Sequence, residues 1–243
     1  MGLNKQSGNM YPFVTHTWNP IRGECPHQCV YCYMKRFKVG KLRLEEKELR
    51  TKLGSGNFIF VGSSTDMWSE EVPDNWITEV LEYTRKFPDN TYLFQTKNPI
   101  RFLEFVDYFS LNSILGVTIE TNRDYKVTKA PEPTKRWADF TLAAGCGFRK
   151  MVSIEPIMDF DLEDFVYLLK AIGPEFVSIG ADSKSHNLPE PSPAKVKELI
   201  SELEKFTEVK IKKNLFRIVN KGSSIEGVRK RDEVRRYKQE VKR

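Results

Sequence analysis

Short apolar runs alternate along the chain with longer amphipathic segments. The runs are rich in β-branched and aromatic residues and show little polar alternation, which is typical of strands buried on both faces of a sheet. They predict seven strands, at residues 13–18, 58–62, 91–95, 113–119, 150–154, 176–179 and 209–211.

The segments between these runs carry the start and stop signals of helices. Prolines open the stretches that begin at residues 99, 133 and 193, and proline is favoured in the first helical turn. Gly145 and Gly173 follow two of the stretches, and glycine readily ends a helix. The pattern predicts helices at residues 75–86, 99–108, 133–144, 162–172 and 193–206.

Strands that alternate with helices predict an α/β domain with a mainly parallel sheet. The pattern alone fits either a partial (βα) barrel or an open doubly wound sheet. Both architectures place ligands at the carboxyl ends of the strands, and the residues just past nearly every predicted strand are polar. Candidate functional side chains are therefore expected at that edge of the sheet.

The composition is that of a globular domain. The chain has 243 residues, of which 40% are hydrophobic and 30% charged, and this balance argues against a disordered chain. No apolar run approaches the roughly 20 residues that a membrane span needs, and the first residues lack the apolar core of a signal peptide. We expect a cytoplasmic protein that does not associate with membranes.

The net charge of +6 is concentrated at the end of the chain. Residues 221–243 contain nine Lys or Arg against four Asp or Glu, which gives this stretch a local charge of +5. We expect a main domain at residues 1–215 and a basic tail or helix at residues 216–243. Such a tail either contacts nucleic-acid phosphates or is simply a solvated terminal helix.

Three of the four cysteines lie within eight residues, in a C-x3-C-x2-C pattern just after the first predicted strand. Cys25, Cys29 and Cys32 can hold three irons of a [4Fe–4S] cluster and leave the fourth iron without a protein ligand. An open iron can bind a small chelating molecule. S-adenosylmethionine (SAM) offers an amino and a carboxylate group for this purpose, and it is a recognised source of radical chemistry.

Other interpretations of the cysteines remain open. A structural zinc site would need a fourth ligand, for which His27 and His16 are candidates. This alternative implies a zinc-stabilised nucleic-acid-binding domain without catalysis. The spacing could also put the cysteines on one helix face as small hydrophobes, although Pro26 argues against a helix through all three.

The residues around the cysteines resemble a known superfamily. Cys25-x3-Cys29-x-Tyr31-Cys32 resembles the radical SAM signature, in which an aromatic residue precedes the third cysteine. The flanking residues 18–23 and 30–33 are similar to the spore photoproduct lyase branch, and most of all to a small uncharacterised phage-type radical SAM family. The resemblance covers about residues 11–215 and implies a partial (βα)6-type TIM barrel, with parallel strands and the cluster loop after the first strand.

The resemblance also implies a function. A radical SAM enzyme uses a [4Fe–4S] cluster to cleave SAM reductively to a 5′-deoxyadenosyl radical, which abstracts hydrogen from a substrate. Such an enzyme needs an external one-electron donor of the flavodoxin or ferredoxin type. The lyase-like motif and the basic tail together favour a nucleobase or nucleic acid as the substrate, with a small metabolite or a peptide as the open alternatives.

Further positions can be carried over from the lyase pattern. Ser64, Thr65 and Asp66 would lie near the SAM amino group, because a carboxylate and hydroxyls suit an ammonium. The remaining contacts implied by the resemblance are Lys97 at the SAM carboxylate, Thr118 or the neighbouring Glu120 at the ribose, Tyr31 beside the adenine, and Gly180 where the adenine approaches the chain.

Two cysteine positions depart from the lyase pattern. Ser64 stands where the lyase has its cysteine hydrogen donor, and a serine hydroxyl cannot replace a thiol in that role. This argues against thymine-dimer repair. Cys146, between Gly145 and Gly147 at a predicted helix end, is expected to be a buried structural thiol rather than a substitute donor.

Overall fold

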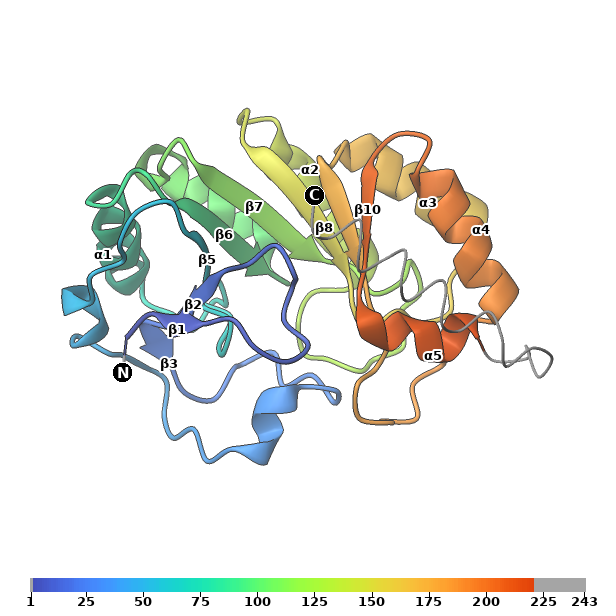
Figure 1. The fold of residues 1–243 in the computed structure, drawn as a ribbon, viewed down its shortest axis with the longest axis horizontal. Coiled ribbons are helices and arrows are strands. Elements are labelled where there is room, and N and C mark those ends of the chain that lie inside the picture. The colour runs from blue at the N-terminus through green and yellow to red at the C-terminus, as the bar shows by residue number, and fades with distance from the viewer. Residues whose placement is uncertain (1, 221–243) are drawn as a thin grey trace.

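An eight-stranded sheet forms the frame of the molecule in the computed structural model, which describes residues 2–220 (Figure 1). Neighbouring strands are parallel, except that β1 is antiparallel to β2. In spatial order the strands are β1 (Asn4–Lys5), β2 (His16–Trp18), β5 (Phe58–Val61), β6 (Thr91–Thr96), β7 (Ser113–Thr118), β8 (Arg149–Ile154), β9 (Phe176–Ile179) and β10 (Glu208–Ile211).

The seven strands from β2 onward are those that the apolar runs predict. Their spatial order is also their order along the chain. A doubly wound sheet would reverse its strand order at a switch point, so this order argues against the doubly wound alternative. The mostly parallel α/β fold is confirmed.

Helices follow the outer side of the curved sheet (Figure 1). They are α1 (Asp74–Arg85), α2 (Pro133–Ala144), α3 (Leu162–Ile172), α4 (Pro193–Leu203) and α5 (Phe216–Val219), with the 3₁₀ helix η3 (Pro99–Tyr108) between β6 and β7. Gly173 ends α3 in the left-handed conformation, with φ of 61°, and the Ser192 side chain caps α4. The prediction of one regular helix at 99–108 is wrong, because the backbone there forms 3₁₀ turns that kink at Phe105.

Alternate side chains of each strand enter two different cores. One set packs outward against the helices, as Ile59 and Val61 of β5 do. The other set faces the concave side of the sheet, where the N-terminal segment covers it. This second core contains Tyr11, Val14, Leu93, Ile114, Met151 and Phe176, with Phe13, Phe58 and Phe60 packed against it.

The same alternation carries polar side chains along the concave face toward the carboxyl ends of the strands. Thr118, Ser153 and Ser178 are register partners across β7, β8 and β9, and they lie above the apolar core. Two residues further along each strand comes a charged layer. Its members are Glu120, Glu155 and Lys212, with Gly180 at the end of β9 between the last two. Lys97, just past β6, lies at the register of Thr118.

A short ribbon and several turns connect these elements. β3 (Ile21–Arg22) pairs antiparallel with β4 (Arg43–Leu44), and this pairing brings the two ends of the intervening segment together. Three further 3₁₀ turns are η1 (Tyr33–Arg36), η2 (Glu48–Arg50) and η4 (Lys213–Leu215). The ribbon therefore holds residues 23–42 as one closed loop at the carboxyl end of β2.

The C-terminal region is described as far as Asn220. Ile218 of α5 is buried in the outer core, and most of the basic tail lies outside the described residues. Among the described residues, no helix combines the length and the apolar character that crossing a membrane requires. The prediction that Cys146 is buried is wrong, because the turn after α2 projects the thiol into solvent.

Candidate cluster and cofactor site

Residues 23–42, which we call the thiol loop, begin and end at a close backbone crossing. Gly23 has φ of +123°, and a Cβ atom at this position would lie 2.4 Å from the Lys41 carbonyl oxygen. Only glycine fits such a crossing without moving the backbone. The sequence Arg22-Gly23 therefore closes the neck of the loop that carries the three cysteines.

The three thiols of the loop line one cavity of about 460 Å³, and the described residues that border it all belong to residues 23–41. Burial, together with the nearby Asp66 carboxylate, raises the pKa of the Cys25 thiol to about 12. Metal ligation requires the thiolate. A bound cation would therefore be needed to hold Cys25 in its ligating form at neutral pH.

The donor set fits an iron–sulfur cluster better than a single zinc ion. His27 Nε2 is directed at Asp66, 3.0 Å away, and His16 Nδ1 lies 2.9 Å from the Thr15 hydroxyl, so each of these candidate zinc ligands has one ring nitrogen engaged. Within the described part of the chain, no three His, Cys, Asp or Glu side chains converge on a point where one ion could sit. A [4Fe–4S] cluster does not require convergence, because each thiolate binds its own iron.

A second segment, residues 127–130, runs beside the thiol loop and is called the clamp segment below. Val30 N donates to the Val127 carbonyl at 2.9 Å, and Lys129 N donates to the His27 carbonyl at 2.7 Å. The Thr128 hydroxyl lies 2.9 Å from the same His27 carbonyl and 3.3 Å from Cys29 Sγ. The clamp segment thus fixes the loop backbone and places one hydroxyl directly on a cysteine sulfur.

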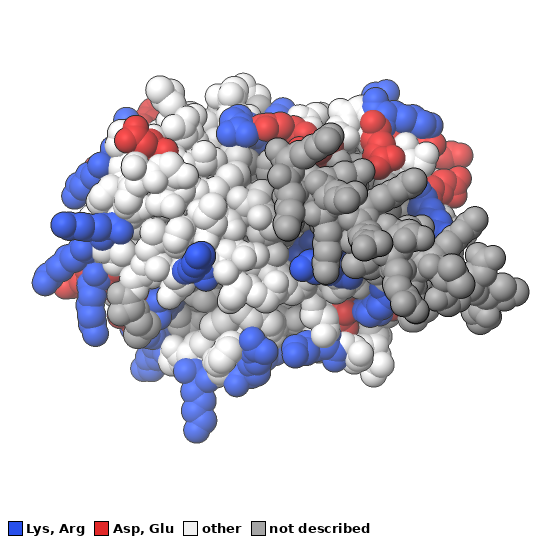
Figure 2. Space-filling view, viewed as in Figure 1, with Lys and Arg blue, Asp and Glu red and all other residues white. Residues whose placement is uncertain are grey.

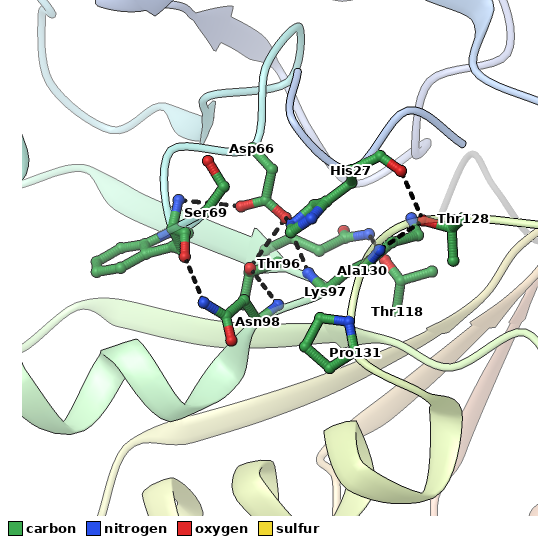
Figure 3. A network of polar contacts seen from close by, with 12 residues as sticks. His27, Asp66, Ser69, Thr96, Lys97, Asn98, Thr118, Thr128, Ala130 and Pro131 are labelled. Carbon is green, nitrogen blue, oxygen red and sulfur yellow. Dashed lines mark hydrogen bonds and ion pairs between the residues drawn. The ribbon is translucent and has the colours of Figure 1, made fainter. Parts of the chain in front are cut away.

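The Asp66 carboxylate joins the thiol loop to the end of β6 (Figure 3). Its Oδ2 atom accepts from the Thr96 hydroxyl and from Lys97 N, both at 2.9 Å, and contacts His27 Nε2. Burial alone would raise the pKa of Asp66. The neighbouring His27 and the backbone hydrogen bonds from Lys97 and Trp68 outweigh burial and hold this pKa below its ordinary value. Asp66 is therefore an ionised link between three segments.

Of its two neighbours, Thr65 also holds the thiol loop, whereas Ser64 is bound to the end of β2. The buried Thr65 hydroxyl donates to the Gly23 carbonyl at 2.9 Å. Ser64 N donates to the Asn19 side chain at 2.9 Å. Asn19 was among the polar strand-end residues, and its amide oxygen fixes the turn that leads to Asp66.

A buried ionic network lies between the thiol loop and the sheet. The Tyr31 hydroxyl donates to Glu120 Oε1, and Arg136 Nη1 donates to Glu120 Oε2 at 2.7 Å. Lys97 Nζ lies 3.6 Å from Glu120 Oε1 and 5.5 Å from the centre of the Tyr31 ring. Thr118 is nearby, because Arg136 also donates to its carbonyl at 2.7 Å.

Electrostatics keep the network charged. Burial opposes ionisation of Glu120, but Arg136, Lys97 and the Tyr31 hydrogen bond outweigh it and lower the pKa of this carboxyl. Burial would likewise lower the pKa of Lys97, yet the neighbouring Cys29 and Glu120 raise it. Lys97 is therefore an ammonium held within reach of the thiol loop, where it can receive a ligand carboxylate.

The opposite side of the strand ends carries a second polar group. Lys212 Nζ pairs with Glu155 Oε2 at 2.7 Å, and the Tyr11 hydroxyl donates to Ser153 Oγ at 2.7 Å. Asn9 Nδ2 lies 3.4 Å from Glu155 Oε1. Sequence reasoning missed Asn9 and Tyr11 because they precede the first parallel strand rather than follow it.

Gly180 belongs to this second group. A Cβ atom there would lie 2.8 Å from the Glu155 carboxyl carbon, so the space that glycine leaves is occupied by a carboxylate. The absence of a side chain at Gly180 thus lets Glu155 lie flat across the end of β9 and reach Lys212. A role for Gly180 toward adenine stays a prediction.

The structure brings most of the predicted site residues together. Tyr31, Lys97, Thr118 and Glu120 meet beneath the thiol loop, Asp66 and Thr65 tie the loop to the sheet, and Gly180 lies apart. A larger cavity of about 640 Å³ lies on the outer side of the clamp segment and is bordered by His27, Asn98 and Arg136. Because the three thiols face the smaller cavity, we take the smaller one as the candidate metal centre.

Two solved structures show a similar fold. A spore photoproduct lyase variant with bound AdoMet and dinucleoside spore photoproduct superposes with a TM-score of 0.60, over 86% of this chain and 80% of that chain, at 12% identity. Streptococcus suis SuiB bound to precursor peptide SuiA gives a TM-score of 0.57, over 89% of this chain and 53% of that chain, at 10% identity. At such identities the likeness concerns the fold.

Comparison with sequence families gives one match. No curated protein matches the chain. The model of a family described as "Protein of unknown function (DUF5131)" matches residues 10–163, which include the thiol loop, the clamp segment and all strands from β2 to β8. This match spans more than half of the chain, and the chain therefore belongs to the DUF5131 family.

Proposed function

We propose that the protein is a radical SAM enzyme. The observation that carries the proposal is the cavity that Cys25, Cys29 and Cys32 all border, at the carboxyl end of β2. Its place on a fold similar to spore photoproduct lyase with bound AdoMet supports this assignment. The three thiols would hold a [4Fe–4S] cluster, and SAM would bind between the thiol loop and the strand ends.

When bound and reduced, the cluster supplies the electron that cleaves SAM to a 5′-deoxyadenosyl radical, which abstracts hydrogen from a substrate. The chain's own residues prepare the site for this. Lys97 presents an ammonium to the SAM carboxylate, and Glu120 with Arg136 holds that ammonium in place. We assign Thr118, or the neighbouring Glu120, to the ribose. The aromatic core beneath these residues excludes water from below.

Several finer assignments form part of the proposal. The chain-order strands and the outer helices support a partial (βα)6-type TIM barrel. We propose residues 1–215 as this barrel domain, followed by the basic tail, and membership of the spore photoproduct lyase branch near its phage-type family. The reduced state that free cysteines and such a cluster require supports a cytoplasmic location.

The substrate that we propose is a nucleobase within a nucleic acid. The similar lyase structure holds a dinucleoside, and the sequence ends in a basic stretch that can contact phosphates. The similar SuiB structure holds a precursor peptide, so a peptide is the competing substrate class. The electron would come from a flavodoxin- or ferredoxin-type donor.

Anaerobic reconstitution with iron and sulfide tests the proposal. We expect about four irons per chain, and production of 5′-deoxyadenosine when dithionite and SAM are added, with single-stranded oligonucleotide present as candidate substrate. Cys29→Ala should abolish both, and Cys146→Ala, which changes the exposed cysteine outside the cavity, should leave both intact.

Tight binding of one zinc ion, with no binding of four irons, would instead support the zinc-stabilised nucleic-acid-binding alternative.

A further inference from the structure

The outer side of the thiol loop carries an exposed cationic surface. Between residues 33 and 43 the sequence has five basic residues and no acidic one. All five are exposed. We call them the basic rim, and they are Lys35, Arg36, Lys38, Lys41 and Arg43.

The charge of the rim is largely unneutralised. Arg43 pairs with Glu45, whereas among the described residues the other four rim side chains have no carboxylate within ion-pair distance. Lys and Arg side chains project along the lower edge of the molecule in Figure 2, where Figure 1 draws the light-blue segment around η1. The rim is thus a local positive field outside the thiol cavity.

Apolar side chains lie within this rim. Phe37 is 50% exposed, and it also lines the thiol cavity, as Met34 and Val39 do. The Arg36 guanidinium sits over the Phe37 ring at 4.7 Å. A small apolar centre surrounded by exposed basic side chains is typical of a transient protein interface, in which charge steers the encounter and a few apolar contacts hold it.

The position of the rim points to electron entry rather than to substrate. Lys35, Lys41 and Phe37 border the same cavity as the three thiols, so a partner seated on the rim lies directly against the candidate metal centre. The strand-end groups that would meet a substrate lie on the inner side of the loop, where Tyr31 reaches Glu120.

We propose that the basic rim is the docking surface for an acidic one-electron carrier of the flavodoxin type. This inference rests on the proposed radical SAM function, which requires a donor but does not say where it binds. An acidic carrier would be attracted by the unpaired rim cations and would rest on Phe37. Salt would weaken the encounter, because the pairs are exposed to solvent.

Charge reversal on the rim tests the docking surface. The double variant Arg36→Glu/Lys38→Glu changes two rim residues that do not line the thiol cavity. At low ionic strength, we expect flavodoxin hydroquinone to reduce the reconstituted cluster of this variant at least about tenfold more slowly than that of the wild type. Dithionite should reduce it at the wild-type rate, because a small reductant does not need the docking surface.

A matched control places the same charge change elsewhere. Lys170→Glu/Lys197→Glu alters two exposed lysines on α3 and α4 and should leave reduction by flavodoxin unchanged. Equal rates of cluster reduction by flavodoxin in the rim variant and the control would contradict the proposed docking surface. Loss of oligonucleotide binding in the rim variant, with flavodoxin reduction intact, would overturn it in favour of nucleic acid.

A binding measurement keeps this test separate from the proposed function. Titration of oxidised flavodoxin into the protein without its cluster, at low ionic strength, should give measurable affinity that the rim variant loses and the control keeps. If no four-iron cluster assembles, the proposed function fails while this titration still decides the docking surface. Absence of binding by the unaltered protein would also overturn it.

Discussion

The Glu120 carboxylate lies at the centre of the buried polar network beneath the thiol loop. It is fully buried, and its charge is tolerated because Arg136, Lys97 and Tyr31 all direct donors or positive charge at it. Such a network is stable when complete and costly when one partner is removed. The consequences of single substitutions there should therefore be large.

Tyr31→Phe removes the hydroxyl that donates to Glu120. Because the bond lost is a buried one to a charged acceptor, we expect the free energy of unfolding to fall by roughly 1.5–3 kcal/mol. Urea denaturation measures this. Tyr33→Phe is the matched control, since the Tyr33 hydroxyl donates to the Ser63 carbonyl from a side chain that is 45% exposed. Equal losses in the two variants would contradict the special role of the Glu120 network.

The Thr128 hydroxyl touches both the thiol loop backbone and a cysteine sulfur. Hydrogen bonds to ligating sulfurs raise the reduction potential of an iron–sulfur cluster. The Thr128 proton points to the His27 carbonyl in this structure and would turn to Cys29 Sγ when that sulfur is a ligating thiolate. Thr128→Val should then shift the midpoint potential of the reconstituted cluster to more negative values, and Thr128→Ser should keep the wild-type value. A potentiometric titration followed by electron paramagnetic resonance provides the measurement. An unchanged potential in the valine variant would show that the hydroxyl does not reach the sulfur.

At the scale of elements, Asp66 connects the thiol loop with the carboxyl end of β6. Its pKa is lowered in the folded protein, so it adds stability that is fully present above its unfolded pKa of about 3.9. That stability is lost as the pH falls through the lower folded pKa. Acid should therefore loosen the link between the loop and the sheet.

Asp66→Asn removes this contribution. The variant should be less stable than wild type at pH 7, and the difference in unfolding free energy should shrink as the pH falls below about 4. Urea denaturation between pH 7 and pH 3 gives both values. Asp107→Asn, at an exposed carboxylate on η3, should follow the wild-type curve. A constant difference between wild type and Asp66→Asn would rule out ionisation of Asp66 as the cause.

The neck of the thiol loop depends on Gly23. Gly23→Ala must meet both a positive φ and the Lys41 carbonyl at 2.4 Å, whereas Gly8→Ala meets a positive φ of 67° with nothing within 4 Å. We expect Gly8→Ala to cost about 1 kcal/mol of unfolding free energy, and Gly23→Ala to cost more, because the β3–β4 crossing must open. Thermal unfolding of the two variants compares them directly. Similar losses of unfolding free energy in the two variants would show that the backbone at the β3–β4 crossing can shift at little cost.

The strands were predictable from the sequence because each is a short apolar run with a polar end. Lys97 and Glu120 stood out because polar residues follow the predicted strands, and such strand ends meet at one edge of a parallel sheet. Thr118 lies inside its predicted strand, and only the resemblance to the lyase pattern pointed to it. Asn9 and Tyr11 were not predictable. Their place depends on the N-terminal segment folding back over the concave face, which is a tertiary contact with no local signal. The kink at Phe105 likewise follows from packing rather than from helix propensity.

At the scale of the whole molecule, the N-terminal segment completes the core of the concave face. Phe13 stacks on Tyr11 with ring centres 5.2 Å apart and meets the Phe176 ring edge-on at 4.9 Å. Phe13→Ala should lower the unfolding free energy by roughly 2 kcal/mol, because the ring is only partly buried. Leu111→Ala, at a side chain that is 98% exposed, should change it by less than about 0.5 kcal/mol. An equally small effect at Phe13 would mean that the segment packs loosely on the sheet.

The aromatic cover formed by Tyr11 and Phe13 also restricts where a ligand can reach the concave face of the sheet. Because these rings lie against Phe58, Phe60 and Phe176, the half of the concave face near the amino ends of the strands is filled. Among the described residues, this filling leaves the carboxyl ends of the strands as the open part of the concave face. In the proposed enzyme, reactant and product would therefore share that end, and the product would have to leave before the next reactant could enter.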